Sequence, residues 1–387
     1  MTGASQAGRF GRARTWGRGL VRTRRRAVAS GAVVVAVAAG LGTWAFQGPL
    51  ASKDSYCWGS WEQDSGSWIL GDEAFSGDDA RGRTSEDSSP TPGKPTGSCT
   101  LAVRSSDGGS GGEHAQQTTV TVKFGTAPKD AKARLAWLNG YLGDGVTPLP
   151  DGLPGAVDST HGLLVLPERC DTRDGHPTAV TLDAQEKRQS GDPRPPSPDV
   201  GGPRGVTELL VSAANKGMEK AGCAPAKPLR VTSPRLTLPE NAGTFYSDPA
   251  CRIKGLDLDL DEKQEDETSY QVGVVTDEQQ SCAVRIGRSN AAHLDALMVA
   301  HPRLDALLKD LHGDAAPARG WRGKGAIEPD HQFVRTQCAG RPTSFLMLGA
   351  PAHDAKRLFA AFTNGVSHRL GCTAVAPAAA AGTEGER

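Results

Sequence analysis

The sequence predicts an α+β fold built as two tandem disulfide-stabilised repeats of similar topology, each a small antiparallel sheet with packed helices, after one N-terminal transmembrane helix. Three observations predict it. One set of motifs occurs twice in the same order, and all eight cysteines follow a single apolar run. Short segments with a two-residue period also alternate with longer segments of helical period, and their hairpin-length connections favour α+β over a doubly wound sheet.

The duplication is clearest in a turn motif. GAVDSTH at residues 155–161 returns as GAIEPDH at residues 325–331, and each copy runs through a short apolar segment into a cysteine, Cys170 or Cys338. An arginine follows each cysteine. Both copies end on a helix-like segment closing with Gly-Cys, which aligns without gaps between residues 209–223 and 358–372. Three motifs in the same order predict two folded units of one topology.

The duplication and the composition together divide the chain into six parts. We expect a cytoplasmic tail at 1–26, a transmembrane anchor at 27–46, extracellular repeat 1 at 51–223, a linker at 224–246, extracellular repeat 2 at 247–373 and a disordered tail at 374–387.

The N-terminal segments carry a membrane signal. Residues 1–26 hold eight arginines and no acid, so the rest of the balanced chain carries 36 basic and 44 acidic residues, a net charge of −8. Residues 27–46 are uncharged, and twenty helical residues span roughly 30 Å, the thickness of one hydrocarbon core. The arginines predict a cytoplasmic N-terminus and a lipid bilayer as partner, rather than nucleic acid. A cleavable signal peptide with Ala36-Val37-Ala38 as its site is the alternative, and it also exports the remainder.

The cysteines agree with export. An even number in an exported chain predicts disulfides. With four cysteines in corresponding places of each copy, bridges within each copy leave three patterns, of which we predict the sequential one: Cys57–Cys99, Cys170–Cys223, Cys251–Cys282 and Cys338–Cys372. Each bridge contributes roughly 3–4 kcal/mol in the chain-entropy model. A zinc site is the alternative, but the close CxxC spacing it usually needs is missing.

Repeat 1 opens with three tryptophans, Trp58, Trp61 and Trp68, which fall on one face of a predicted helix. They predict either a buried face or a platform for stacking sugars. Strands are expected at 98–103, 118–124, 163–166 and 178–182, and helices at 129–142 and 206–222.

Repeat 2 is shorter. Strands are expected at 270–275, 282–286, 333–334 and 345–348, a long helix at 291–311 interrupted at Pro302, and a closing helix at 355–370. Residues 256–261 alternate leucine with aspartate, which predicts a strand with its leucines inward. As an EF-hand loop, this segment has Glu262 where glycine is needed and Thr268 in place of the final glutamate.

The candidate functional residues lie in the repeated motifs. Asp158 and His161, and in the second copy Glu328 and His331, place an acid three residues before a histidine. Such a pair can orient an imidazole for proton transfer or contribute two metal ligands, or the acid can simply cap the turn into a strand. A single pair supplies too few ligands for a tight metal site, and no cofactor is expected.

The arginines that follow the strand cysteines are the second candidate. Arg173 and Arg341 can present a guanidinium to an anionic ligand, or form a salt bridge at a solvated hairpin tip.

The motifs CWGSW, GSCT and LLVLPERC resemble segments of uncharacterised exported, membrane-anchored proteins of high-GC Gram-positive bacteria. The resemblance covers the layout of residues 20–372 and only these motifs in detail. The chain is also distantly similar to extracellular sensor-like lipoprotein domains, which pair a helix cysteine with a strand cysteine and bind ligands or partners. It departs from them because it lacks a lipobox and carries two copies.

These observations predict a single-pass membrane protein whose extracellular module binds an envelope ligand or protein partner without catalysis. The alternative is a cell-envelope hydrolase that uses one of the acid–histidine pairs, although the sequence has no HExxH, GxSxG or phosphate-loop motif.

Overall fold

The computed structural model describes residues 55–63, 65, 67–71, 82–107, 114–143, 145–188, 198, 200–233, 249–287, 292–311 and 313–381. All of them belong to one compact unit, Asp54–Arg387. The predicted tail at 1–26 and anchor at 27–46 lie outside the described residues. Within the described ranges, every helix is too short or too polar to cross a membrane.

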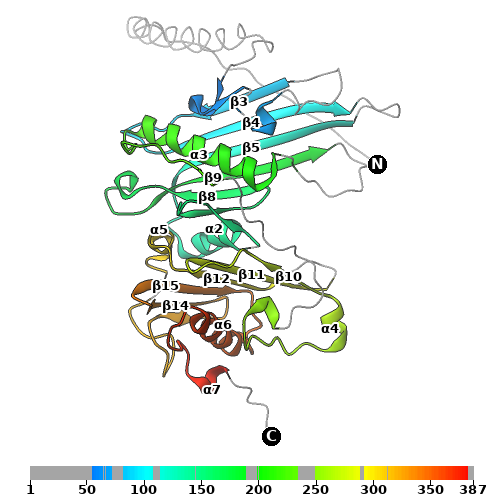
Figure 1. Cartoon of the computed structure of the whole chain (residues 1–387), viewed down its shortest axis with the longest axis vertical. Coiled ribbons are helices and arrows are strands. Elements are labelled where there is room, and N and C mark those ends of the chain that lie inside the picture. The colour runs from blue at the N-terminus through cyan, green and yellow to red at the C-terminus, as the bar shows by residue number, and fades with distance from the viewer. Residues whose placement is uncertain are drawn as a thin grey trace, which may run out of the picture. The chain divides into compact units, whose positions relative to one another are not determined.

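Repeat 1 is built on a seven-stranded antiparallel sheet (Figure 1). Its strands, in spatial order, are β3 (Gly82–Ser88), β4 (Gly97–Asp107), β5 (His114–Thr126), β9 (Thr178–Arg188), β8 (His161–Val165), β7 (Gly155–Val157) and β6 (Thr147–Pro148). The helix α3 (Gly202–Ala221) crosses one face of the sheet (Figure 1). Shorter elements are η1 (Cys57–Gly59), η2 (Trp68–Leu70), η4 (Glu168–Cys170), the β1 (Ser55–Tyr56) and β2 (Trp61–Glu62) pair, and α2 (Ala131–Leu142).

Repeat 2 is built on a separate six-stranded antiparallel sheet. Its strands, in spatial order, are β10 (Thr268–Val272), β11 (Gln279–Ile286), β12 (Ala292–Val299), β15 (Arg341–Leu348), β14 (His331–Cys338) and β13 (Lys324–Ile327). The helix α6 (Ala355–Arg369) covers one face. Shorter elements are η5 (Ala250–Arg252), α4 (Glu262–Asp266), α5 (Pro302–Asp305), η6 (Ala306–Leu308) and α7 (Ala378–Ala381).

The two sheets have the same strand order. The series β3-β4-β5-β9-β8-β7 matches β10-β11-β12-β15-β14-β13 position by position, and only β6 is extra. Each repeat begins with a cysteine at positive φ, Cys57 or Cys251, and ends with a helix that closes on the last cysteine. The prediction of two units with one topology is therefore confirmed for the described residues.

The repeated glycine is explained by the register of the sheets. Gly155 lies opposite Leu164 and Gly325 lies opposite Val334. A Cβ at either glycine would lie 2.0 Å from a backbone carbonyl oxygen of the neighbouring strand. Because no such contact is tolerated, only glycine lets β7 and β13 approach their partner strands.

Each sheet packs one face against its own closing helix. In β5, Val120, Val122 and Phe124 are buried against α3, whereas the alternate Thr119, Thr121 and Lys123 are more accessible, as the two-residue period predicted. In repeat 2, Phe345 of β15 packs edge-on against Phe362 of α6, with ring centroids 5.8 Å apart.

A third hydrophobic core is shared by the two repeats. Leu138 and Leu142 of α2 join Leu297 of β12, Leu308 of η6 and Phe333 of β14 in one buried cluster. The polar contacts agree, since the Asn139 amide donates to Asp295 Oδ2 at 3.0 Å. The two repeats therefore pack against each other and are not independent domains joined only by a linker.

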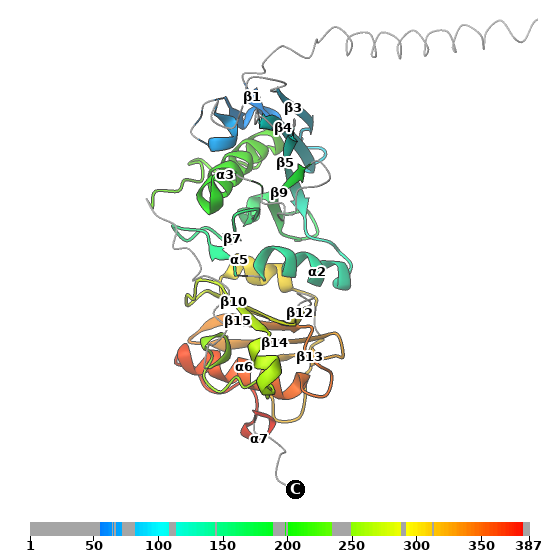
Figure 2. The ribbon, with the colours of Figure 1, turned by 90° about the vertical axis from the view of Figure 1, so that its right-hand side faces the viewer.

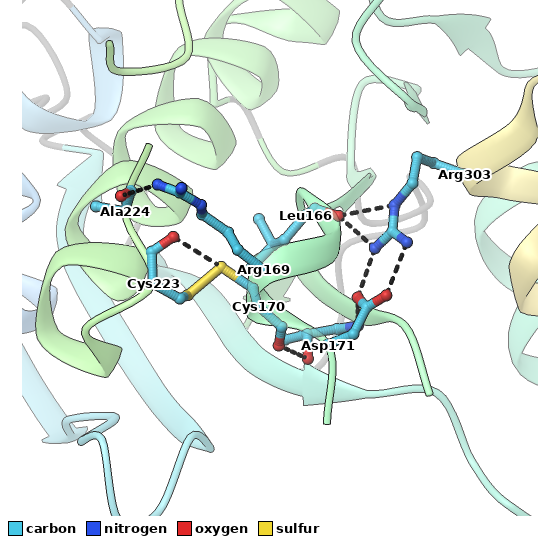
Figure 3. The surroundings of a disulfide bond; sticks show 8 residues. Leu166, Arg169, Cys170, Asp171, Cys223, Ala224 and Arg303 are labelled. Carbon is cyan, nitrogen blue, oxygen red and sulfur yellow. Dashed lines mark hydrogen bonds and ion pairs between the residues drawn. A yellow bond between two sulfur atoms is a disulfide. The ribbon is translucent and has the colours of Figure 1, made fainter. Parts of the chain in front are cut away.

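An ion pair also joins the repeats (Figure 3). Arg303 of α5 points both Nη atoms at the two Asp171 carboxylate oxygens, 2.6 and 2.8 Å away, and its Nε donates to the Leu166 carbonyl at 3.0 Å. Asp171 directly follows Cys170, whose disulfide to Cys223 lies beside it (Figure 3). The Cys170–Cys223 disulfide thus fixes the chain next to Asp171, the carboxylate that pairs with Arg303 of the other repeat.

All four predicted disulfides are confirmed: Cys57–Cys99, Cys170–Cys223, Cys251–Cys282 and Cys338–Cys372. Each closes within one repeat, as the duplication required.

The predicted tryptophan helix is wrong. The segment forms η1, β2 and η2, and Trp58 adopts a left-handed φ of 65° that breaks any helix. The expectation of burial holds for Trp58 and Trp61, and the Trp61 indole donates to the Leu209 carbonyl of α3 at 3.0 Å. Figure 2 shows this N-terminal segment of repeat 1 beside α3. These two rings are core residues and not a sugar platform.

The predicted long helix at 291–311 is also wrong in its first half. Residues 292–299 form β12, and Pro302 begins the short α5 at a position where its missing N–H costs nothing. The strand is buried on both faces, with Leu294 and Met298 toward α6 and Leu297 and Val299 toward the shared core. Apolar residues on both faces from position 296 to 299 hide the two-residue period.

Two further expectations change in detail. Residues 256–260 do not form a strand, although Leu256 and Leu258 are buried and Asp261 caps α4. The segment 374–387 was expected to be disordered, but Val375 and Ala376 are buried against repeat 2.

Candidate functional site

The acid–histidine pair of repeat 1 holds a tight turn. The backbone N–H of Asp158 donates to the His161 carbonyl at 2.9 Å, and Asp158 Oδ1 accepts from the backbone N–H groups of Thr160 and His161 at 2.5 and 2.6 Å. Its second oxygen lies 3.2 Å from His161 Nδ1. Asp158 thus caps the turn that leads into β8, the structural alternative for this motif.

The electrostatics of Asp158 follow from these bonds. Burial acts to raise the pKa of Asp158, but the hydrogen bonds from His161 and from the Thr160 backbone outweigh it and hold the pKa below the ordinary value of 3.8. Nearby, burial and Asp183 raise the pKa of Tyr141, whose hydroxyl donates to Asp183 at 2.7 Å. Asp158 is therefore an ionised acceptor at neutral pH.

The pair in repeat 2 is made differently. The turn is the same, with the Glu328 backbone N–H donating to the His331 carbonyl at 2.8 Å. The carboxylate beside His331 Nδ1, however, belongs to Asp330 at 2.9 Å, and Glu328 is exposed. The hydrogen bond from His331 lowers the pKa of Asp330.

The two arginines occupy solvated positions. Arg173 is exposed in the loop after η4. Arg341 lies 3.8 Å from Glu278 in a pair whose side chains are 42% and 47% exposed, the arrangement of a weak surface salt bridge. Among the six predicted residues, the described side-chain contacts join only Asp158 to His161.

A cleft of about 550 Å³ lies elsewhere in repeat 1, between α3 and the chain that follows Cys57. Its polar lining includes Glu62, Ser67, Glu208, Ser212, Lys216 and Glu219, and Trp61, Leu70 and Leu209 add apolar surface. The volume is in the range that binds a small ligand or a few residues of a peptide.

The side chains of the cleft are set by its two walls. On α3, Lys216 and Glu219 are one turn apart and their charged groups meet at 2.8 Å, which lowers the pKa of Glu219. On the opposite wall, Ser67 is 6% exposed, and its Oγ meets no hydrogen-bond partner among the described residues. Three carboxylates against one lysine make the lining acidic.

Repeat 2 fills the corresponding space with its own chain. The gapless alignment of the closing helices pairs Lys216 with Gly365 and Glu208 with Arg357. A Cβ at Gly365 would meet the Lys254 carbonyl oxygen at 2.6 Å, and Arg357 donates to the Asp257 carbonyl at 2.9 Å. The chain after Cys251 therefore runs along α6, whereas the described chain after Cys57 turns back into β2 and borders the cleft together with α3.

The repeated asparagine of the closing helix has a structural role in both copies. The Asn215 side chain bonds both the N–H and the carbonyl of Leu229, at 2.8 and 2.9 Å. Asn364 does the same for the residues after Cys372, accepting from Val375 and donating to Ala376. Each asparagine thus holds the segment that follows the last cysteine of its repeat against the closing helix.

Sequence reasoning missed the cleft because it compared the positions at which the two copies agree. The signal lies among the positions where they differ, which pair Lys216 with Gly365 and Glu208 with Arg357. The described part of the chain has no cluster of three or more His, Cys, Asp or Glu side chains suited to a metal ion.

Comparisons of the chain with protein families, with curated proteins and with solved structures found no match. The site is therefore interpreted from its own geometry.

Proposed function

We propose that this protein is a membrane-anchored extracellular module that binds a ligand or protein partner of the cell envelope, without catalysis, through the cleft of repeat 1. The apolar segment 27–46 and the arginines before it support the anchor. The four disulfides support an oxidising compartment.

One observation carries the proposal. The surface of the closing helix differs between the two repeats. In repeat 2, residues 253–258 cover α6, whereas in repeat 1 Lys216 and Glu208 of α3 border a cleft. A hollow kept beside a buried, unpartnered hydroxyl such as Ser67 is a feature of a ligand site. The acid–histidine pairs do not support a hydrolase equally well, since Asp158 is engaged in its turn.

Site-specific photo-cross-linking in intact cells tests this function. The full-length protein carries a photoreactive residue at Glu62, on the rim of the cleft, or at the exposed Lys356 of α6 as the matched control. We expect an adduct from position 62 that is absent from position 356. The substitution Ser212→Trp, which fills the cleft, should abolish that adduct while the protein keeps its thermal transition. No adduct at position 62, or an adduct that survives Ser212→Trp, would refute the proposal.

A further inference from the structure

We infer that the occupant of the cleft is an extended peptide segment of a partner protein that carries lysine or arginine. This inference rests on the proposed function, because it names the class of ligand for the same cleft.

The shape of the occupant follows from repeat 2. There the groove along the closing helix holds a stretch of chain, Ile253 to Leu258, that has no regular secondary structure beyond η5 and a turn. Ile253, Leu256 and Leu258 are buried in the core of that repeat, and the Asp257 carbonyl accepts from Arg357. The scaffold is thus already built to seat a peptide against this helix.

The charge of the occupant follows from the difference between the copies. In repeat 2 the helix presents Arg357 to a segment that carries Asp257 and Asp259. In repeat 1 the aligned helix position is Glu208, and Glu62 and Glu219 also line the cleft. Lys216 pairs with Glu219, and Arg204, outside the lining, pairs with Glu208 at 2.9 Å. The excess negative charge of the lining therefore comes mainly from Glu62, and a basic peptide complements it.

The remaining groups of the cleft suit a peptide backbone. Ser67, a lining residue, has a buried Oγ with no hydrogen-bond partner among the described residues. Leu70 and Leu209 also line the cleft. The lining thus combines polar groups that can fix the orientation of a ligand with apolar side chains.

Charge also argues for a partner rather than a neighbouring part of this chain. Residues 72–81 follow the cleft-lining segment in sequence and contain Asp72, Glu73, Asp78 and Asp79 with one arginine, Arg81. A segment of that sign repels the glutamates of the cleft.

Fluorescence anisotropy with two defined peptides tests the inference, using the full-length protein in detergent micelles. The neutral probe copies residues 253–258, Ile-Lys-Gly-Leu-Asp-Leu, whose lysine and aspartate balance, and the basic probe replaces its aspartate by lysine. We expect the basic probe to bind on the order of tenfold more tightly at low salt, and the difference to shrink as salt is added.

Two charge-reversal variants locate the effect. Glu208→Lys should abolish or invert the preference, and it is tolerable because the Arg204–Glu208 pair is a surface contact with side chains 78% and 40% exposed. Glu262→Lys makes the same change of net charge on the exposed α4 of repeat 2 and should leave the preference intact.

Three results would overturn the inference: equal affinity for both probes, no binding of either, or an equal response to the two variants. A chito-oligosaccharide that binds where neither peptide does would also overturn it. The cross-link from position 62 separates the two claims, because its persistence in any of these cases leaves the proposed function standing and its absence removes both.

Discussion

At the scale of single residues, the repeated glycine allows β7 and β13 to lie close to their partner strands. Gly155→Ala or Gly325→Ala places a methyl group 2.0 Å from a carbonyl oxygen, so the strand must shift or separate. We expect each variant to lose about 1–3 kcal/mol of unfolding free energy, or more if the strand detaches. Urea denaturation measures this loss.

Gly140→Ala is the matched control for those variants. This glycine lies in α2, no atom lies within 4 Å of the place that an alanine methyl group would occupy, and alanine favours helix. The variant should be more stable by about 0.5–1 kcal/mol. A loss at Gly140 equal to that at Gly155 would contradict the steric explanation.

A second prediction at this scale concerns Asp158. Because its pKa is depressed in the folded protein, its stabilising effect is complete above the ordinary value of 3.8 and is lost as the pH falls through the folded value. Asp158→Asn should therefore cost about 1–2 kcal/mol at pH 7, and the gap to the wild type should narrow below pH 3.8. Denaturant unfolding of both proteins at several pH values from 7 to 3 measures this difference in stability.

Glu328→Gln serves as the control, since Glu328 is the aligned but exposed acid of repeat 2. Its effect should stay within about 0.5 kcal/mol at every pH. If the two variants behave alike, the turn bonds of Asp158 are not the source of the stability.

Prediction from sequence succeeded at this scale where the chemistry is local. The acid and histidine of repeat 1 do meet, because a turn of four residues brings them together whatever surrounds it. In repeat 2 the same spacing did not predict the partner of the histidine ring, because the adjacent Asp330 bonds His331 in place of Glu328. The spacing in the sequence alone does not determine which of two nearby acids contacts the imidazole.

At the scale of elements, the fork between Arg303 and Asp171 ties α5 of repeat 2 to η4 of repeat 1. Both side chains are about one-sixth exposed. Removing one partner leaves the other charge poorly solvated, so Arg303→Ala or Asp171→Ala should cost about 3–5 kcal/mol, and the double variant less than their sum. Thermal or urea unfolding of the wild type, the two single variants and the double variant measures these free energies and gives the coupling energy of the pair.

The comparison pair is Lys324–Asp314, whose side chains are 58% and 97% exposed. Lys324→Ala should cost no more than about 1 kcal/mol. Additive effects of Arg303→Ala and Asp171→Ala would show that the fork does not couple the repeats.

Elements with one buried face were predictable and those with two were not. The strand β5 shows its alternation openly because one face is polar. The strand β12 packs on α6 and on the shared core, so its leucines mimic a helical stripe. The helix at Trp58 failed for another reason, because a disulfide core holds that backbone at positive φ.

At the scale of the whole molecule, the shared core predicts that the repeats unfold together. Leu308 of η6 is 1% exposed in that core. Leu308→Ala should lower the unfolding free energy by about 2–5 kcal/mol and keep a single transition by fluorescence and by circular dichroism. Val275→Ala, at the exposed Val275, should change little. Two separated transitions in the wild type would contradict a common core.

The shared topology of the two repeats and the closure of every disulfide within one repeat were predictable from the duplication, because each copy constrains the other. The packing of one repeat on the other was not. Its residues come from both repeats, among them α2, β8, β12, η6 and β14, and no periodicity within one segment reports a contact with another.

The central claim is that repeat 1 keeps open a groove that repeat 2 fills, and that a ligand enters it. Hydrogen exchange measured on the full-length protein, with and without cell-envelope extract, tests this within one molecule. We predict slower exchange at residues 59–63, 67–71 and 208–219, which border the cleft, and no change at residues 253–258 or 357–368. Unchanged exchange along α3, or equal protection of both closing helices, would contradict the account.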